Sequence, residues 1–282
     1  MITYRDLVDG LRKLEIDPAR PIIAHASLSA FGKVQGNAET VVGALLRVYN
    51  TLVMPVFTYK TMVTPETGPP DNALMYGRGK DTNRMAEFFH PDMPADRMMG
   101  AIAETLRRHP RARRSDHPIL SFTGVNAEMA LEAQSLAEPL APIRVLSESW
   151  GWVLLLGVDH KVNTSLHYAE RKAGRKQFVR WGLTPKGICE CPGFPGCSDG
   201  FPVIAPRLES LTRRVPIGPA EVQAVSLPDL VEAACLWING DPAALLCQRA
   251  DCGRCNAVRA VITPPGCAGG ERGSPPGYYG SP

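Results

Sequence analysis

Apolar side chains at helical spacing alternate with short apolar runs along the first two thirds of the chain. Leu7, Leu11 and Leu14 share one face of a helix expected over residues 4–14. Because near-continuous apolar runs suit a sheet covered on both faces, the pattern predicts an α/β fold with a mostly parallel central sheet flanked by helices. The expected strands are residues 21–25, 51–57, 119–123 and 152–157, and the further helices are 38–49, 83–89, 98–108 and 228–237.

The composition changes near residue 184, where glycine, proline and cysteine become frequent. We therefore expect a major α/β domain over residues 1–183 and a smaller cysteine-bearing subdomain or insertion over 184–262. Residues 263–282 are about half glycine and proline, which predicts a flexible tail.

The charge is mixed along the 282 residues, with 31 basic and 28 acidic side chains and a formal net charge of +3. This balance indicates neither a nucleic acid nor an anionic membrane as partner. No segment approaches the roughly 18 apolar residues of a membrane span, and residues 1–6 lack the layout of a signal peptide. A cytoplasmic location is expected, and the oligomeric state stays open.

The candidate for chemistry is a histidine at the start of a helix. An apolar strand at residues 153–156 runs through Gly157 into a helix that Asn163 or Thr164 caps, so His167 lies in its first turn. The helix dipole there favours the neutral, proton-accepting form of an imidazole. The alternative is a structural histidine satisfied by Glu170.

All eight cysteines lie after residue 188. In a reducing compartment such clustering favours metal ligation over disulfides. Cys252 and Cys255 form a CxxC motif, and Cys191 with Cys197, or Cys189, would complete a four-sulfur zinc site of structural type.

The alternative for the cysteines is a set of buried free thiols, since cysteine packs well as a small apolar residue. Cys235 and Cys247 are expected to be core residues of this kind. The remaining cysteine, Cys267, falls in the expected tail.

Several segments, taken in order, resemble the antibiotic N-acetyltransferase family, typified by aminoglycoside 3-N-acetyltransferases. They are residues 25–32 (HASLSAFG), 51–55 (TLVMP), 114–118 (RSDHP), 154–158 (LLLGV) and 163–170 (NTSLHYAE). The likeness covers about residues 5 to 240, and the CGRC sequence at 252–255 is similar to the end of the apramycin-resistance branch. The match in order makes chance agreement improbable.

The resemblance implies an acyltransferase that moves the acetyl group of acetyl-coenzyme A to an aminoglycoside 3-amine and so confers antibiotic resistance. His167 would be the general base, and an acidic residue would orient it. We expect that acid to be Glu190 first and Asp199 second. The alternative for either carboxylate is a solvated loop residue.

Acetyl-coenzyme A needs a narrow apolar channel for its pantetheine and cations or amides for its pyrophosphate. The loop after the first strand suits the channel, and the basic segment before the third strand suits the pyrophosphate, although its arginines would also fit a solvated helix end. The expected donor-binding residues are His25, Ala26, Ser27, Leu28, Ser29, Phe31, Arg113, Arg114 and Ser115.

A polycationic acceptor implies a pocket lined by carboxylates and carbonyls. The long loop at residues 58–80 supplies Glu66, Asp71 and Asn72 as candidates, with Tyr76 either closing over a sugar ring or packing as an ordinary aromatic. Two rival functions remain at this point. One is an acetyltransferase for another amine metabolite, and the other is a nonenzymatic zinc-stabilised binding module.

Overall fold

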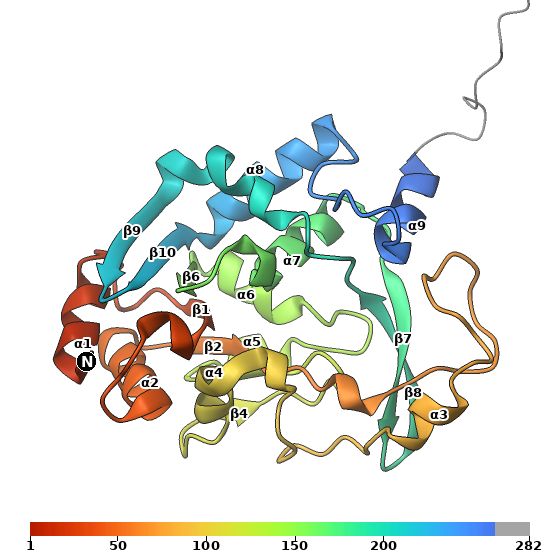
Figure 1. Cartoon of the computed structure of the whole chain (residues 1–282), viewed down its shortest axis with the longest axis horizontal. Helices are drawn as coiled ribbons and strands as arrows, with labels where there is room; N and C mark the ends of the chain where they lie inside the picture. The colour runs from red at the N-terminus through yellow and green to blue at the C-terminus, as the bar shows by residue number, and fades with distance from the viewer. Residues whose placement is uncertain (263–282) are drawn as a thin grey trace, which may run out of the picture.

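The computed structural model describes residues 1–262 and contains a central sheet of seven strands (Figure 1). Among these residues no helix is long and apolar enough to cross a bilayer. In spatial order the strands are β4 (Arg113–Arg114), β5 (Phe122–Val125), β2 (Leu52–Pro55), β1 (Ile22–Ala26), β6 (Trp152–Leu156), β10 (Ala220–Ser226) and β9 (Thr212–Ile217).

The middle of this sheet is parallel and both margins are antiparallel. Strand β1 pairs in parallel with β2 on one side and with β6 on the other, and His25 lies opposite Leu155. Strands β5 and β4 extend the sheet in antiparallel fashion beyond β2, and β10 and β9 do so beyond β6. The expected α/β fold is therefore confirmed. Its parallel pairing lies in the three middle strands, β2, β1 and β6.

Helices cover both faces of the sheet, as the apolar strands require. Because successive strand residues point to opposite faces, Ile23 contributes to one core and its neighbours Ile22 and Ala24 to the other. One core packs against α5 (Glu128–Glu132), α6 (Ala141–Glu148), α7 (Thr164–Lys172) and α8 (Leu227–Gly240), and the other against α1 (Tyr4–Arg12), α2 (Asn37–Val48) and α4 (Gly100–Arg107).

Local sequence explains why the first helix forms where it does. Thr3 caps α1 by accepting a hydrogen bond from the backbone N–H of Asp6, whose carboxylate accepts from the Thr3 backbone in return. Leu7, Leu11 and Leu14 are all buried, which confirms the apolar face expected from their spacing. By contrast, the helix expected over 83–89 is displaced, since α3 spans Lys80–Arg84.

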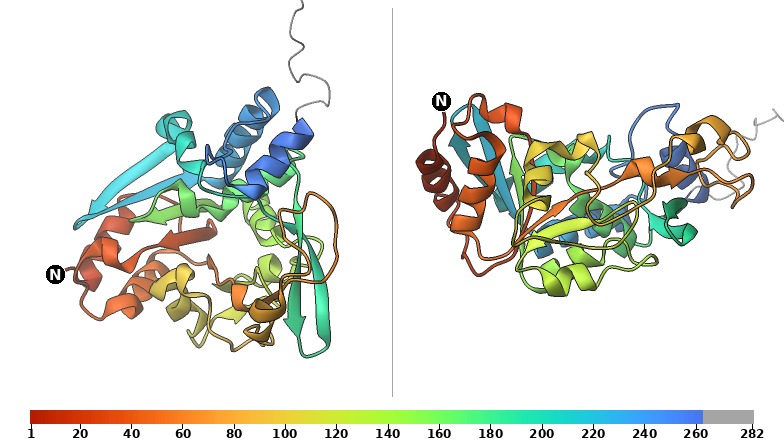
Figure 2. Two further views of the ribbon diagram at one scale, coloured as in Figure 1. Left: turned by 45° about the vertical axis from the view of Figure 1, so that its right-hand side comes forward. Right: turned by 90° about the horizontal axis from the view of Figure 1, so that it is seen from below.

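A second, three-stranded sheet stands beside the central one (Figure 2). It comprises β3 (Met62–Val63), β7 (Phe178–Thr184) and β8 (Gly187–Phe194), and α9 (Gly253–Ile262) lies near it at the carboxyl-terminal side. The boundary expected at residue 184 falls at the turn between β7 and β8, and β9 and β10 return to the central sheet. Residues 184–262 thus contribute to both sheets. The tail expected over 263–282 lies outside the described residues.

Candidate functional site

A cavity of about 840 Å³ opens at the carboxyl ends of β1 and β2, beside the amino-terminal turn of α7. Open α/β sheets place ligand sites at this edge, where neighbouring strands diverge. Its wall is mostly apolar and includes Met54, Phe57 and Met99, and His167 reaches it from α7. The cavity therefore joins a mostly apolar space to an imidazole suited to proton transfer.

The start of α7 is fixed by its cap. Asn163 is the N-cap residue, and its side-chain oxygen accepts a hydrogen bond from the Ser165 backbone N–H at 3.1 Å. This confirms one of the two caps expected from the sequence and places His167 in the first turn. The turn before it, η4 (His160–Val162), is capped in the same way by Asp159.

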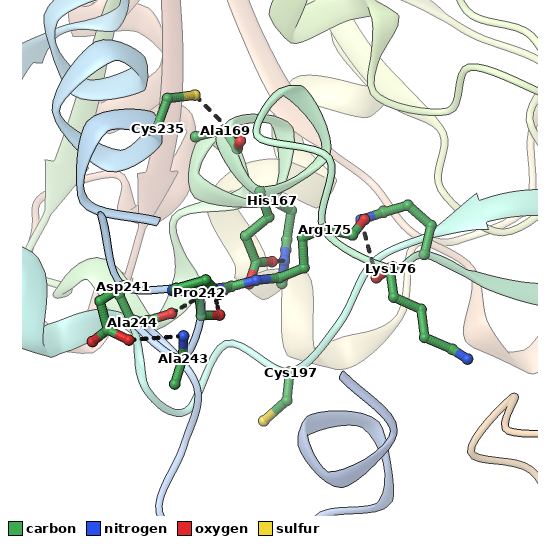
Figure 3. A network of polar contacts seen from close by, with 12 residues as sticks. His167, Ala169, Arg175, Lys176, Cys197, Cys235, Asp241, Pro242, Ala243 and Ala244 are labelled. Carbon is green, nitrogen blue, oxygen red and sulfur yellow. Dashed lines mark hydrogen bonds and ion pairs between the residues drawn. The ribbon is translucent and has the colours of Figure 1, made fainter. Parts of the chain in front are cut away.

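A buried polar network holds the His167 imidazole. Its Nδ1 lies 2.8 Å from Oε2 of Glu170, and Oε1 of the same carboxylate lies 2.7 Å from Nη1 of Arg175. Nη2 of Arg175 in turn donates to the backbone oxygens of Pro242 and Ala244 (Figure 3). Both oxygens of Glu170 and both terminal nitrogens of Arg175 are thus hydrogen-bonded, which is what allows charged side chains to be this deeply buried.

The network also fixes which ring nitrogen is available. A carboxylate only accepts hydrogen bonds, so the Nδ1–H of a neutral His167 donates to Glu170 and the lone pair remains on Nε2. The imidazole lies against Phe201 with ring centroids 4.6 Å apart, and its side chain is 11% exposed. The contact with Glu170, expected of a structural histidine, therefore leaves the proton-accepting atom free at the cavity wall.

The structure corrects the expected acidic partner of His167. Glu190 is exposed on β8, paired in register with Trp181, and Asp199 is held in ion pairs with Lys161 and Arg249, each at 2.9 Å. Neither carboxylate hydrogen-bonds the imidazole. The reason is local: positions separated by three residues share a helix face, so Glu170 reaches His167 without help from another segment.

The end of β1 and the loop that follows it contribute five of the nine expected donor-binding residues to the cavity wall. These are His25, Ala26, Ser27, Leu28 and Ser29. Phe31, at the end of the 3-10 turn η1 (Leu28–Phe31), is instead buried in the core formed with α1 and α2. The turn places the Ser27 and Ser29 hydroxyls 3.0 Å apart.

His25 is a neutral group within this wall. Burial, and to a lesser extent the nearby His160, lowers the pKa of its imidazole to about 3. Its Nε2 is buried and has no hydrogen-bond partner among residues 1–262. An uncharged imidazole at the end of β1 keeps this part of the wall free of positive charge.

The basic segment before β5 does not reach the cavity, contrary to expectation. Arg113 is exposed and lies 3.6 Å from Glu128, and Ser115 is buried against the Phe122 backbone. The Arg114 guanidinium donates to the backbone oxygens of Met93, Pro91 and Val56, so it ties the β2–α4 connection to β4. Its donors are consumed by carbonyl groups, which explains its absence from the ligand wall.

The acceptor residues expected in the long loop also lie away from the cavity wall. Glu66 and Asp71 are exposed. Asn72 is buried and binds the backbone of Val179 through both its oxygen and its nitrogen, at 2.8 and 3.0 Å. Tyr76 accepts a hydrogen bond from Asn72 and packs edge-on against Trp181, so these two residues attach the loop to β7.

Four cysteines converge into a single cluster. The Sγ atoms of Cys197, Cys247, Cys252 and Cys255 lie within 4.8 Å of one another, and all four residues are buried. The structure thus brings together three of the four expected cysteines and leaves out Cys191, whose sulfur lies 4.0 Å from that of Cys189 on β8. Residues 241–252 loop back beside Cys197, which brings in Cys247, the residue expected to be an ordinary core thiol.

A family model described as aminoglycoside 3-N-acetyltransferase matches residues 23–239, more than half of the chain. The chain belongs to the aminoglycoside 3-N-acetyltransferase family. The resemblance read from the ordered segments is therefore confirmed, and so is the acyltransferase class.

Relatives in this family cover most of the chain. The aminoglycoside N(3)-acetyltransferase III of Salmonella sp is 31% identical over 233 residues, which span 73% of this chain and 79% of the relative. The aminoglycoside N(3)-acetyltransferase IX of Micromonospora chalcea is 32% identical over 196 residues, which span 64% of this chain and 66% of the relative. The crystal structure of the aminoglycoside acetyltransferase AAC(3)-IVa apoenzyme superposes with a TM-score of 0.75 at 25% identity, covering 92% of this chain and 97% of that chain.

From the sequence, Glu170 is expected only as the partner of a structural histidine and Cys247 only as a core thiol, and Arg175 is not among the expected site residues. Glu170 carried a usable signal, because its i,i+3 spacing from His167 predicts contact on one helix face. Arg175 is close in sequence to Glu170, but its other partners, Pro242 and Ala244, are 67 and 69 residues away. Cys247 is close in sequence to Cys252 and Cys255, but only the folded chain brings it to Cys197.

Proposed function

We propose that this member of the aminoglycoside 3-N-acetyltransferase family transfers the acetyl group of acetyl-coenzyme A to an aminoglycoside 3-amine, with His167 as general base. The observation that carries the proposal is the orientation of the imidazole. Glu170 binds Nδ1 at 2.8 Å, and the remaining ring nitrogen lies at a cavity that the loop after β1 also lines.

The chemistry requires a base at that position. The amine nitrogen attacks the thioester carbonyl carbon, the carbon–sulfur bond breaks, and coenzyme A leaves as the thiolate. Nε2 of His167 takes the proton that the nitrogen loses and can pass it to the departing sulfur. Glu170 positions the ring and stabilises the imidazolium that forms, and Arg175 holds that carboxylate in place.

The donor thioester fits the part of the cavity nearest η1. The apolar wall around Met54 and Met99 suits the pantetheine chain, and the backbone N–H groups that open a 3-10 turn have no partner within the turn. Such donors, together with the Ser27 and Ser29 hydroxyls, are suited to an oxyanion that develops on the thioester carbonyl.

The cysteine cluster supports a structural zinc ion. Four thiols within mutual reach match the ligand set and number of a closed tetrahedral site, and they leave no open position for a reactant. Cys197 follows β8, while Cys252 and Cys255 flank the start of α9. A metal held there would cross-link these two segments, and the catalytic steps do not pass through it.

We further propose that the enzyme works in the cytoplasm. The seven cysteines among the described residues are free thiols, including four close enough for metal binding. A reducing compartment keeps such thiols available to a metal.

The proposal is tested by incubating the enzyme with acetyl-coenzyme A and a panel of aminoglycosides that differ in the 3-position. Thiol release gives the rate, and two-dimensional NMR of each product identifies the acetylated nitrogen. We expect acetylation at the 3-amine and none of an analogue that has a hydroxyl there. Acetylation confined to a simple amine metabolite would support the rival acceptor class, and release of no thiol with any amine would contradict the enzymatic proposal.

A further inference from the structure

Two arginines line the cavity on the side of the second sheet. Arg180 comes from β7 and Arg254 from the start of α9. Arg180 is only 6% exposed, and its guanidinium lies over the rings of Phe178 and Phe194, 5.7 and 5.0 Å from their centroids. A guanidinium held this firmly between aromatic faces is a fixed part of the cavity wall.

The hydrogen bonds of these arginines are made to neutral groups and involve one nitrogen of each. Nη1 of Arg180 donates to the backbone oxygens of Asn72 and Val179, and Nη1 of Arg254 donates to the backbone oxygen of Gly196 at 2.9 Å. Within residues 1–262, neither arginine forms an ion pair. Nε and Nη2 of both have no protein partner there, so two forks of donors remain for a ligand.

The rest of the wall formed by residues 1–262 gives these charges no counterion. The lining residues in that part of the chain include no aspartate or glutamate, and their one lysine, Lys161, is already paired with Asp199 at 2.9 Å. Burial, together with the neighbouring charge of Arg254, lowers the pKa of Arg180 to about 10, so the side chain is still a cation at neutral pH. A buried cation beside a second, half-buried one, with no carboxylate among the described lining residues, is unfavourable unless a bound anion compensates them.

The geometry points to an oxyanion subsite in which Arg180 and Arg254 bind a phosphate group of a reactant. Planar guanidinium forks match phosphate oxygens in pairs, which a lysine cannot do. This inference rests on the proposed function, because it assigns a second part of the same cavity. A polycationic acceptor does not account for two arginines in the wall, so the inference adds a further substrate class, an amine that also carries phosphate.

The phosphate has two possible sources, the acceptor or the phosphates of coenzyme A. The position of the subsite favours the acceptor. Strand β7 and α9 lie on the side of the molecule opposite α2 in Figure 1, whereas η1 follows directly from β1 in the central sheet. His167 on α7 stands between them. A thioester held at η1 therefore leaves the arginine side of the cavity to the amine.

Titration calorimetry tests the subsite without turnover, so its result is independent of whether acetyl transfer occurs. Inorganic phosphate, coenzyme A, pantetheine, glucosamine and glucosamine 6-phosphate are titrated into the wild type, Arg180→Gln, Arg254→Gln and the double variant. Arg207→Gln is the matched control, because Arg207 also lies over an aromatic ring, that of Trp237, but does not line the cavity. Thermal unfolding verifies that each variant is folded. If substitution of the buried Arg180 prevents folding, the less buried Arg254→Gln still tests the subsite.

We expect inorganic phosphate to bind the wild type and Arg207→Gln equally, and about tenfold more weakly to each single variant. If the acceptor supplies the phosphate, the variants lose the preference for glucosamine 6-phosphate over glucosamine and bind coenzyme A as before. If the donor supplies it, they bind coenzyme A about tenfold more weakly and pantetheine unchanged. Equal affinity of the wild type and the double variant for both inorganic phosphate and coenzyme A, or no phosphate binding by the wild type, would overturn the subsite.

Discussion

Nδ1 of His167 lies 2.8 Å from Oε2 of Glu170, three residues along the same helix. The contact sets the tautomer of the ring, so replacing the carboxylate by an amide should disturb catalysis more than binding. We predict that Glu170→Gln lowers kcat by about 10²–10⁴-fold while the KM for acetyl-coenzyme A changes little. Steady-state rates at several concentrations of both substrates measure the two parameters separately.

Glu190→Gln and Asp199→Asn are the controls for that substitution, because neither carboxylate contacts the imidazole. Both should keep kcat within about threefold of the wild type. The pH profile of kcat adds a readout that mere loss of packing would not move, since only a positioning role changes how the rate depends on proton transfer. A Glu170→Gln enzyme with wild-type kcat and pH profile would refute the positioning role.

Gly157 permits the close approach of η1, the turn that follows β1, to the end of β6. Its φ is +66°, and a Cβ there would lie 2.2 Å from that of Ala30. We predict that Gly157→Ala displaces η1 and raises the KM for acetyl-coenzyme A at least tenfold. Gly174→Ala is the matched control, because Gly174 has a similar φ of +76° but open space around it. It should cost only the backbone strain of about 1 kcal/mol in unfolding free energy, and equal KM values for both variants would argue against this role of Gly157.

The cysteine cluster predicts which thiols retain metal. Protein purified without chelator should contain one zinc ion per chain by atomic emission spectroscopy, and Cys247→Ser should lose most of it. Cys191→Ser should keep it, because Cys191 lies next to Cys189 and outside the cluster. Zinc loss should also lower the thermal unfolding midpoint, since the ion would join the segment after β8 to α9. Retention of zinc by Cys247→Ser would contradict the assignment.

His117 makes stability depend on pH. Its Nδ1 accepts hydrogen bonds from the Ile119 and Leu120 backbone N–H groups, and burial lowers its pKa to about 4. The unfolded chain, with a histidine pKa near 6.5, binds the proton more tightly, so stability is full above pH 6.5 and falls as the pH drops towards 4. The loss from this group is up to about 3 kcal/mol.

Denaturant unfolding at a series of pH values measures that dependence. His117→Asn keeps an acceptor for the two backbone N–H groups and removes the titration, so its stability should fall less steeply between pH 6.5 and 4. A slope identical to that of the wild type would show that His117 binds no extra proton on unfolding.

Local patterns were sufficient to predict the elements that build the catalytic edge. The apolar run of β6, the cap at Asn163 and the position of His167 follow from residues within a few positions of one another. The same is true of α1, whose buried leucines share one helix face. These elements are also the ones that surround the candidate base, so the centre of the site was predictable from sequence.

The remainder depends on contacts between distant segments. The charge of Arg114 favours a ligand-binding role in the sequence, whereas in the fold its guanidinium donates to the backbone oxygens of Met93 and Val56. Cys247 joins its cluster only because the chain folds back beside Cys197. Nothing near Arg180 in the sequence shows that its side chain lines a cavity whose other described residues include no carboxylate.

The most direct test of the account compares the initial rates of acetyl transfer by the wild type and His167→Ala, with an aminoglycoside that the wild type acetylates at the 3-amine. Coenzyme A affinity, measured by calorimetry, establishes that the variant still forms the donor site. The account predicts a fall in kcat of at least about 10²-fold with coenzyme A affinity within about twofold of the wild type. A His167→Ala enzyme that acetylates the 3-amine at the wild-type rate would contradict it.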